Sequence, residues 1–125
     1  MYCIRLASWT VAFACALPAS SVFAADISAA QKDGICRVSL ARINGNAPRD
    51  YQRKRRVADT FTYASARGYI YDCEVFSDGM AFTLSNEDWG RLRPTGSVKT
   101  VGKCSSIRLF DPGFGLTHEL RSCVP

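Results

Sequence analysis

The sequence predicts an all-β domain: a small, disulfide-stapled antiparallel sandwich or partly open barrel, with one or two short helical turns. Three observations support this fold class. Apolar and polar residues alternate over several short stretches, an Asp-Gly pair marks a tight turn between two of them, and four cysteines follow the N-terminal segment. A chain of this size buries only a modest core, so covalent cross-links would add useful stability.

Residues 1–24 are predicted to be an export signal. Arg5 supplies a positive charge, an apolar stretch follows over residues 6–17, and Val22 and Ala24 are small residues placed where signal cleavage occurs. The apolar stretch is shorter than the ~20 residues that a membrane-spanning helix needs. We therefore expect residues 25–125 to form a single mature domain without a membrane span, in a periplasmic or secreted protein of bacterial type.

Alternation predicts two strands in the first half of the mature domain, over residues 35–43 and 57–63. Residues 69–85 then form a hairpin, because Asp-Gly at positions 78 and 79 accepts the positive φ angles of a type I′ turn. This turn sets the register, with Cys73 opposite Leu84 and Val75 opposite Phe82. One face of the hairpin is therefore apolar and carries a cysteine, and the other is polar.

Residues 85–88 read as the start of one helical turn, which would pack Trp89 over the core, and residues 98–101 as a short strand. The last two strands span residues 103–110 and 116–123. If Cys104 faces Cys123, then Arg108 faces Glu119, Ile107 faces Leu120 and Leu109 faces His118. One register thus satisfies the disulfide, an opposite-charge pair and the apolar pattern together.

The four cysteines of the mature domain are predicted to form two disulfides, Cys36–Cys73 and Cys104–Cys123, because each pair lies on a shared face. Each bridge is expected to stabilise the fold by roughly 2–4 kcal/mol. The chain has one histidine and no C-x-x-C pair, which argues against a zinc site and a redox role. We expect no cofactor and no metal.

The positive charge is concentrated in one segment. The chain carries +5, and the mature domain, with fifteen bases and eleven acids, would carry +4. Residues 49–56 alone hold five bases and one acid, so the rest of that domain is neutral. A nucleic-acid surface needs bases spread along a groove or stripe, so this distribution argues against a nucleic-acid partner.

We predict that residues 44–56 form a loop, or a loop with a short helix, which is either merely solvated or a docking point for an anionic partner. Phe114, at the tip of the glycine-rich loop 111–115, is expected to be exposed and to form a recognition patch with Trp89 or Tyr51. The predicted binding residues are Arg49, Tyr51, Arg53, Lys54, Arg55, Arg56, Trp89 and Phe114.

The sequence thus favours a non-catalytic, exported binding module that recognises a protein or an anionic envelope component. A second interpretation is a small secreted hydrolase of the ribonuclease type, built from Glu74, His118 and Arg91 or Arg93. The predicted strands place Glu74 on a polar face and His118 on an apolar one, which argues against their convergence. A third interpretation is a structural or assembly component of the cell envelope, which would co-purify with an oligomer or a membrane fraction.

Overall fold

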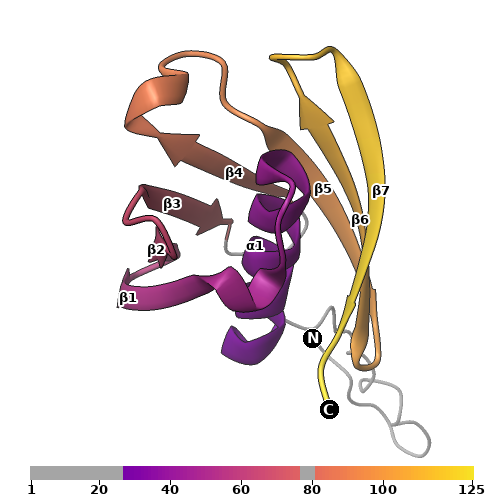
Figure 1. Cartoon of the computed structure of the whole chain (residues 1–125). Helices are drawn as coiled ribbons and strands as arrows, with labels where there is room; N and C mark the ends of the chain where they lie inside the picture. Colours follow the sequence, from indigo (N-terminus) through magenta and orange to yellow (C-terminus); the bar gives the residue numbers. More distant parts are fainter. Residues whose placement is uncertain (1–26, 77–80) are drawn as a thin grey trace, which may run out of the picture.

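The computed structural model describes residues 27–76 and 81–125, which form one seven-stranded antiparallel sheet and one long helix (Figure 1). The elements are α1 (Ala29–Asn44), the 3₁₀ turn η2 (Pro48–Asp50), β1 (Tyr51–Val57), β2 (Thr60–Ser65), β3 (Ile70–Val75), β4 (Ala81–Asn86), the 3₁₀ turn η3 (Glu87–Trp89), β5 (Thr95–Val101), β6 (Cys104–Asp111) and β7 (Leu116–Cys123). The signal peptide predicted for residues 1–24 and the turn predicted at Asp78-Gly79 lie outside the described residues.

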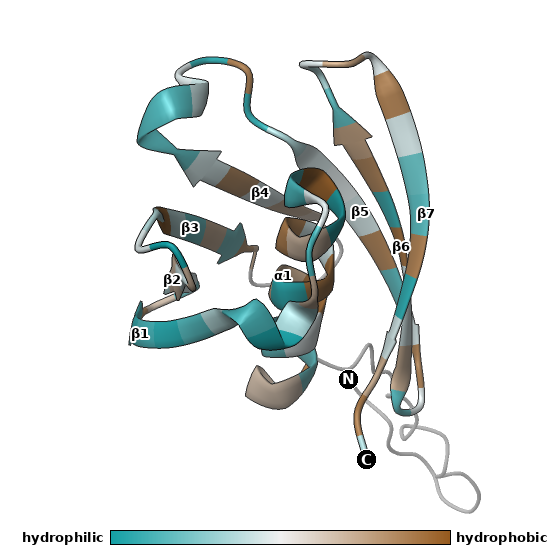
Figure 2. Ribbon diagram, viewed as in Figure 1, coloured by the Kyte–Doolittle hydropathy of each residue, from teal (hydrophilic) through white to brown (hydrophobic). Residues whose placement is uncertain are grey.

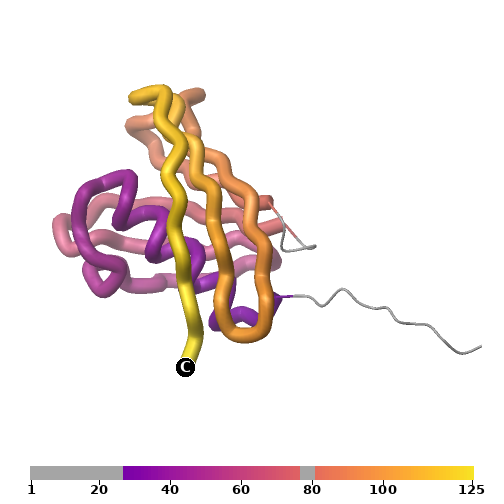
Figure 3. Tube along the Cα trace, turned by 90° about the vertical axis from the view of Figure 1, so that its right-hand side faces the viewer, coloured from indigo at the N-terminus to yellow at the C-terminus, as the bar shows by residue number. Residues whose placement is uncertain are grey.

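Each strand pairs with its neighbours in sequence, so the sheet is an open meander in the order β1 to β7. Figure 1 shows the sheet curving around α1, with β1 to β4 on one side of the helix and β5 to β7 on the other. Figure 3 views the same arrangement from the side of β7. The prediction of a mainly β, antiparallel, disulfide-linked fold is confirmed, but the element that covers the sheet is a helix rather than a second sheet.

The strand predicted over residues 35–43 is wrong, because these residues belong to α1. A capping box starts the helix: the Gln31 amide donates to Ser28 Oγ at 3.1 Å, and the Ser28 amide donates to Gln31 Oε1 at 2.9 Å. Gly45 ends it in the left-handed conformation, with φ of 72°. The buried positions recur every three or four residues, which is the helical period. They are Lys32, Ile35, Cys36, Ser39, Leu40 and Ala41.

The helix is held against both halves of the sheet. The disulfide Cys36–Cys73, formed by two fully buried residues, ties α1 to β3. On the other side α1 approaches β7 so closely that a Cβ atom added at Gly34 would lie 2.5 Å from Ser122 Oγ. A glycine at this position therefore permits the close contact between helix and sheet.

The registers predicted for the two best-defined strand pairs are confirmed. In the first pair, Cys73 lies opposite Leu84 and Val75 opposite Phe82. In the second, Cys104 pairs with Cys123, Ile107 with Leu120, Arg108 with Glu119 and Leu109 with His118. Both predicted disulfides are present, and Arg108 Nε lies 2.9 Å from Glu119 Oε2.

The loop predicted over residues 44–56 is wrong in its second half. After η2, residues 51–57 form β1, the strand at one edge of the sheet. The single strand predicted over residues 57–63 is instead the turn between two strands, where Ala58 adopts a φ of 53°, followed by most of β2. Basic side chains are uncommon at buried positions, and at an edge their long stems remain in solvent, so β1 lacks the apolar alternation of an inner strand.

The core lies between α1 and the concave face of the sheet. Figure 2 shows hydrophobic segments on α1 and on the strands around it, whereas the hydrophilic colour follows β1. Large apolar side chains contributed by β1, β2, β4 and β6 are fully or almost fully buried there. They include Tyr51, Phe61, Tyr63, Phe82, Leu84, Ile107 and Leu109.

Candidate binding surfaces

Four consecutive bases lie exposed on β1, and we call Arg53, Lys54, Arg55 and Arg56 the basic edge strand. The pairing with β2 shifts between Arg53 and Arg55, so Lys54 occupies a β-bulge. Arg53 lies opposite Tyr63 and Arg56 opposite Phe61, both of which point into the core, while Arg55 lies opposite Thr62. Directly opposite residues share a face, so the bulge distributes the bases over both faces of the sheet edge.

An aromatic ring supports two of these bases. The guanidinium carbon of Arg53 lies 5.5 Å from the centre of the Phe61 ring, and that of Arg56 lies 5.3 Å from the same centre. Both distances fall within the range of cation–π attraction. The ring thus favours positions of Arg53 and Arg56 beside the concave face, although both side chains remain exposed.

Hydrogen bonds from α1 hold the start of β1 in place. The Tyr63 hydroxyl donates to Asp33 Oδ1 at 2.6 Å, and Arg37 Nε donates to Asp33 Oδ2 at 2.8 Å. Arg37 also donates to the carbonyl oxygen of Tyr51. Burial, followed by the hydrogen bond to Asp33, raises the pKa of Tyr63 well above its usual range. This network joins α1 to β2 and to the start of β1.

Tyr51, which was predicted to be a binding residue, is only 1% exposed. Its hydroxyl donates to Asn46 Oδ1 at 2.8 Å and accepts from Asn44 Nδ2 at 2.8 Å. Its ring packs edge-on against Tyr71, with centres 5.8 Å apart. Tyr51 therefore anchors the chain between α1 and β1, and its ring is not available at the surface.

No base of the basic edge strand forms an ion pair among the described residues. The ion pairs of residues 27–76 and 81–125 are Lys32–Asp59 at 3.6 Å, Arg37–Asp33 at 2.8 Å and Arg108–Glu119 at 2.9 Å. None of these pairs involves Arg49 or a member of the basic edge strand. Arg49 itself lies in η2, just before β1. The bases of the predicted segment are thus exposed and take no part in the ion pairs of the described residues.

Trp89 and Phe114 lie on a second surface. Phe114 is predicted from the sequence to form a patch with either Trp89 or Tyr51, and Trp89 is the one that lies beside it. The two residues line a cleft of about 240 Å³ together with Ile43, Leu92 and Pro94, and we call it the Trp89–Phe114 cleft. Phe114 is 79% exposed at its lip, which confirms the exposure predicted for this residue. Trp89 is half-buried and packs against Tyr71, with ring centres 5.3 Å apart.

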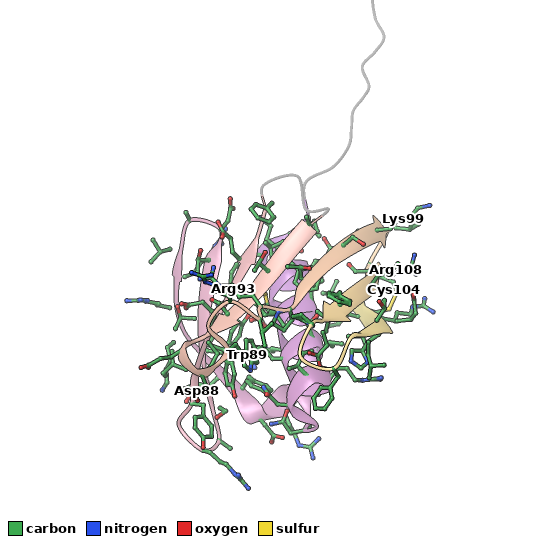
Figure 4. The ribbon with its side chains drawn as sticks, turned by 90° about the horizontal axis from the view of Figure 1, so that it is seen from above. Asp88, Trp89, Arg93, Lys99, Cys104 and Arg108 are labelled. Carbon is green, nitrogen blue, oxygen red and sulfur yellow. A yellow bond between two sulfur atoms is a disulfide. The ribbon has the colours of Figure 1, made fainter. Side chains whose placement is uncertain are left out.

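Figure 4 looks down on the end of the molecule that carries Asp88, Trp89 and Arg93, with Lys99, Cys104 and Arg108 on the opposite side of the view. The cleft draws its walls from the end of α1, from η3 and the segment after it, and from the β6–β7 turn. Sequence reasoning missed Ile43, Leu92 and Pro94. The sequence offered one signal for these residues: Leu92 is an apolar residue between two arginines in an otherwise polar segment, which is typical of a side chain with a contact to make.

The residues of the hydrolase interpretation do not converge. Glu74 pairs with Thr60 and Thr83 and is exposed on the convex face. His118 pairs with the buried Leu109 on the concave face of β7. Within the described ranges no group of three histidine, cysteine, aspartate or glutamate side chains is placed to hold a metal ion.

Two features bear on the cellular environment. Both disulfides are formed, which is consistent with an oxidising, extracytoplasmic location. Among the residues described, no helix has the length and apolar character needed to cross a membrane.

Comparisons of the chain with protein-family models, with curated proteins and with solved structures found no match. The two surfaces themselves are therefore the basis for a proposal about function.

Proposed function

We propose that this protein is an exported, non-catalytic binding module of the periplasm or the extracellular space, and that it captures an anionic partner along the basic edge strand. The partner is an acidic face of a protein or an anionic component of the cell envelope. The observation that carries this proposal is the run of four exposed bases on the edge strand of the sheet, none of which forms an ion pair among the described residues.

The geometry favours an extended anionic surface over a small anion. Arg55 lies on the convex side of the edge, Arg53 and Arg56 lie on the concave side, and Lys54 lies at the bulge between them. A single small anion cannot contact bases on both sides of a strand, whereas a chain or surface of negative charges can. Arginine also forms paired hydrogen bonds with carboxylate and phosphate groups.

The experiment replaces Arg53, Lys54, Arg55 and Arg56 with glutamine and measures capture by pull-down from envelope extract, and retention on immobilised heparin and on phosphatidylglycerol vesicles. All four side chains are exposed, so the melting temperature should stay within a few degrees of that of the wild type. Capture should be lost. Wild-type retention should weaken steeply above physiological salt, where the screening length falls below about 8 Å.

The matched control replaces Arg67, Arg91, Lys99 and Lys103, which are also exposed, with glutamine. Both variants lower the net charge of the chain from +5 to +1. The control should retain the partner if position matters, and should lose it equally if only total charge matters. Equal loss in both variants, or full retention in the edge variant, would reject the proposal.

A further inference from the structure

The Trp89–Phe114 cleft has the size of one side chain. Its volume of about 240 Å³ lies below the range of about 300–1,000 Å³ that is typical of sites for drug-sized ligands. Leu92 and Phe114 are 58% and 79% exposed at its rim, and half-buried Trp89 contributes an aromatic wall. Large apolar groups exposed beside a concave surface are typical of sites that receive an apolar anchor from a partner.

The charged side chains that line the cleft are acidic. Asp88 and Asp111 line it, and no base does. A wider polar hollow of about 560 Å³ shares Asp88 with the cleft and adds Asp72 and Glu87, against a single arginine, Arg93. Neither Asp88 nor Asp111 takes part in an ion pair within the described part of the chain. An apolar anchor with a neighbouring positive charge would therefore match both the shape and the charge of this surface.

We propose that the Trp89–Phe114 cleft binds a single apolar side chain that is followed by a lysine or arginine in a partner protein. The apolar group fills the space between the Trp89 and Phe114 rings, and the base lies toward Asp88. This site is separate from the basic edge strand, because no residue of 53–56 lines the cleft. Its chemistry is also opposite, since the edge attracts anions and the cleft attracts a cation beside an apolar group.

The test uses the ¹⁵N-labelled mature domain, residues 25–125, in which Trp89 is the single tryptophan and therefore gives the one indole N–H resonance. Three end-blocked pentapeptides are titrated: one with phenylalanine followed by lysine between glycines, one with glutamate in place of the lysine, and one with alanine in place of the phenylalanine. The phenylalanine–lysine peptide should shift the resonance saturably. Binding should weaken about fivefold with glutamate and about tenfold or more with alanine.

Three variants locate the effect. Phe114→Ser should abolish the shift, whereas Phe110→Ser, which removes an exposed ring from the convex face of the same hairpin, should not. Asp88→Asn should remove most of the preference for lysine over glutamate. The variant with glutamine at positions 53–56 should bind the peptide normally, so a failure of the proposed anionic capture would leave this result intact.

Several results would overturn the inference. They are a resonance that no peptide moves, equal binding of the lysine and glutamate peptides, and equal loss of binding in Phe110→Ser and Phe114→Ser. An indole shift that follows protein concentration without any peptide would show that a second copy of the chain occupies the cleft, which also contradicts the proposal.

Discussion

At the scale of single residues, Tyr63 connects stability to alkaline pH. Its pKa is raised by burial and by the hydrogen bond to Asp33. Below about pH 10, the usual pKa of tyrosine, the phenol is protonated in both the folded and the unfolded state, and its contribution to stability is complete. Above that pH the unfolded chain loses this proton while the folded chain keeps it. The free energy of unfolding should then fall by about 1.4 kcal/mol per pH unit from this group.

The check is urea unfolding between pH 7 and pH 11.5. Tyr63→Phe should lose about 1–3 kcal/mol at pH 7, because Asp33 loses a buried donor, but its stability should decline less steeply above pH 10. Tyr69→Phe, at a half-exposed ring, is the control and should keep the wild-type slope. A slope above pH 10 that is the same in Tyr63→Phe and wild type would contradict this assignment.

Gly34 provides a second test at this scale. Alanine is normally better than glycine inside a helix by about 1 kcal/mol. Here the new Cβ would lie 2.5 Å from Ser122 Oγ, so Gly34→Ala should instead lower the free energy of unfolding by about 1–3 kcal/mol. The additional change Ser122→Gly should recover most of this loss in urea unfolding. A stabilising Gly34→Ala would mean that the Ser122 side chain rotates away at little cost.

At the scale of elements, the two disulfides differ in access. Cys36 and Cys73 are both fully buried where α1 meets β3, whereas Cys104 is half-buried and Cys123 exposed at the sheet edge. Their sequence separations of 37 and 19 residues give similar chain-entropy contributions of about 4 and about 3 kcal/mol. Access, rather than loop length, should therefore decide which bridge is reduced first.

Increasing dithiothreitol, followed by alkylation and peptide mass mapping, should label Cys104 and Cys123 under native conditions. Cys36 and Cys73 should be labelled only when urea is added, because a thiolate reaches their sulfurs only after the helix leaves the sheet. Labelling of Cys36 before Cys123 in native buffer would show that α1 separates from the sheet more readily than its packing implies.

The elements also differ in how well the sequence predicts them. The registers of β3–β4 and β6–β7 follow from local alternation, a tight turn and paired cysteines, so they were predictable. Helix α1 was not, because residues 35–43 fit a period of two almost as well as the helical period in so short a window. The capping box that marks the helix begins at Ser28, seven residues before the stretch over which the alternation was seen.

At the scale of the whole molecule, the sequence predicts the pairing of neighbouring strands. It does not predict the curvature of the sheet, which brings segments that are distant in sequence together. Trp89 and Phe114 could be proposed as partners because both are aromatic residues near turns. Ile43 could not, because its place in the cleft depends on α1 ending beside η3. The basic edge strand was located correctly along the chain but assigned the wrong conformation, since exposed arginines and lysines give little sign of strand pairing.

The open sheet has two edge strands, β1 and β7. The bases on β1 repel the same strand of a second copy of the protein. If two copies paired along β1, their eight positive charges would lie close together, and the bulge at Lys54 would interrupt the pairing. Natural sheets use such charges and bulges to prevent stacking into fibrils. The feature that we propose to attract a negative partner would therefore also keep the protein dispersed at high concentration.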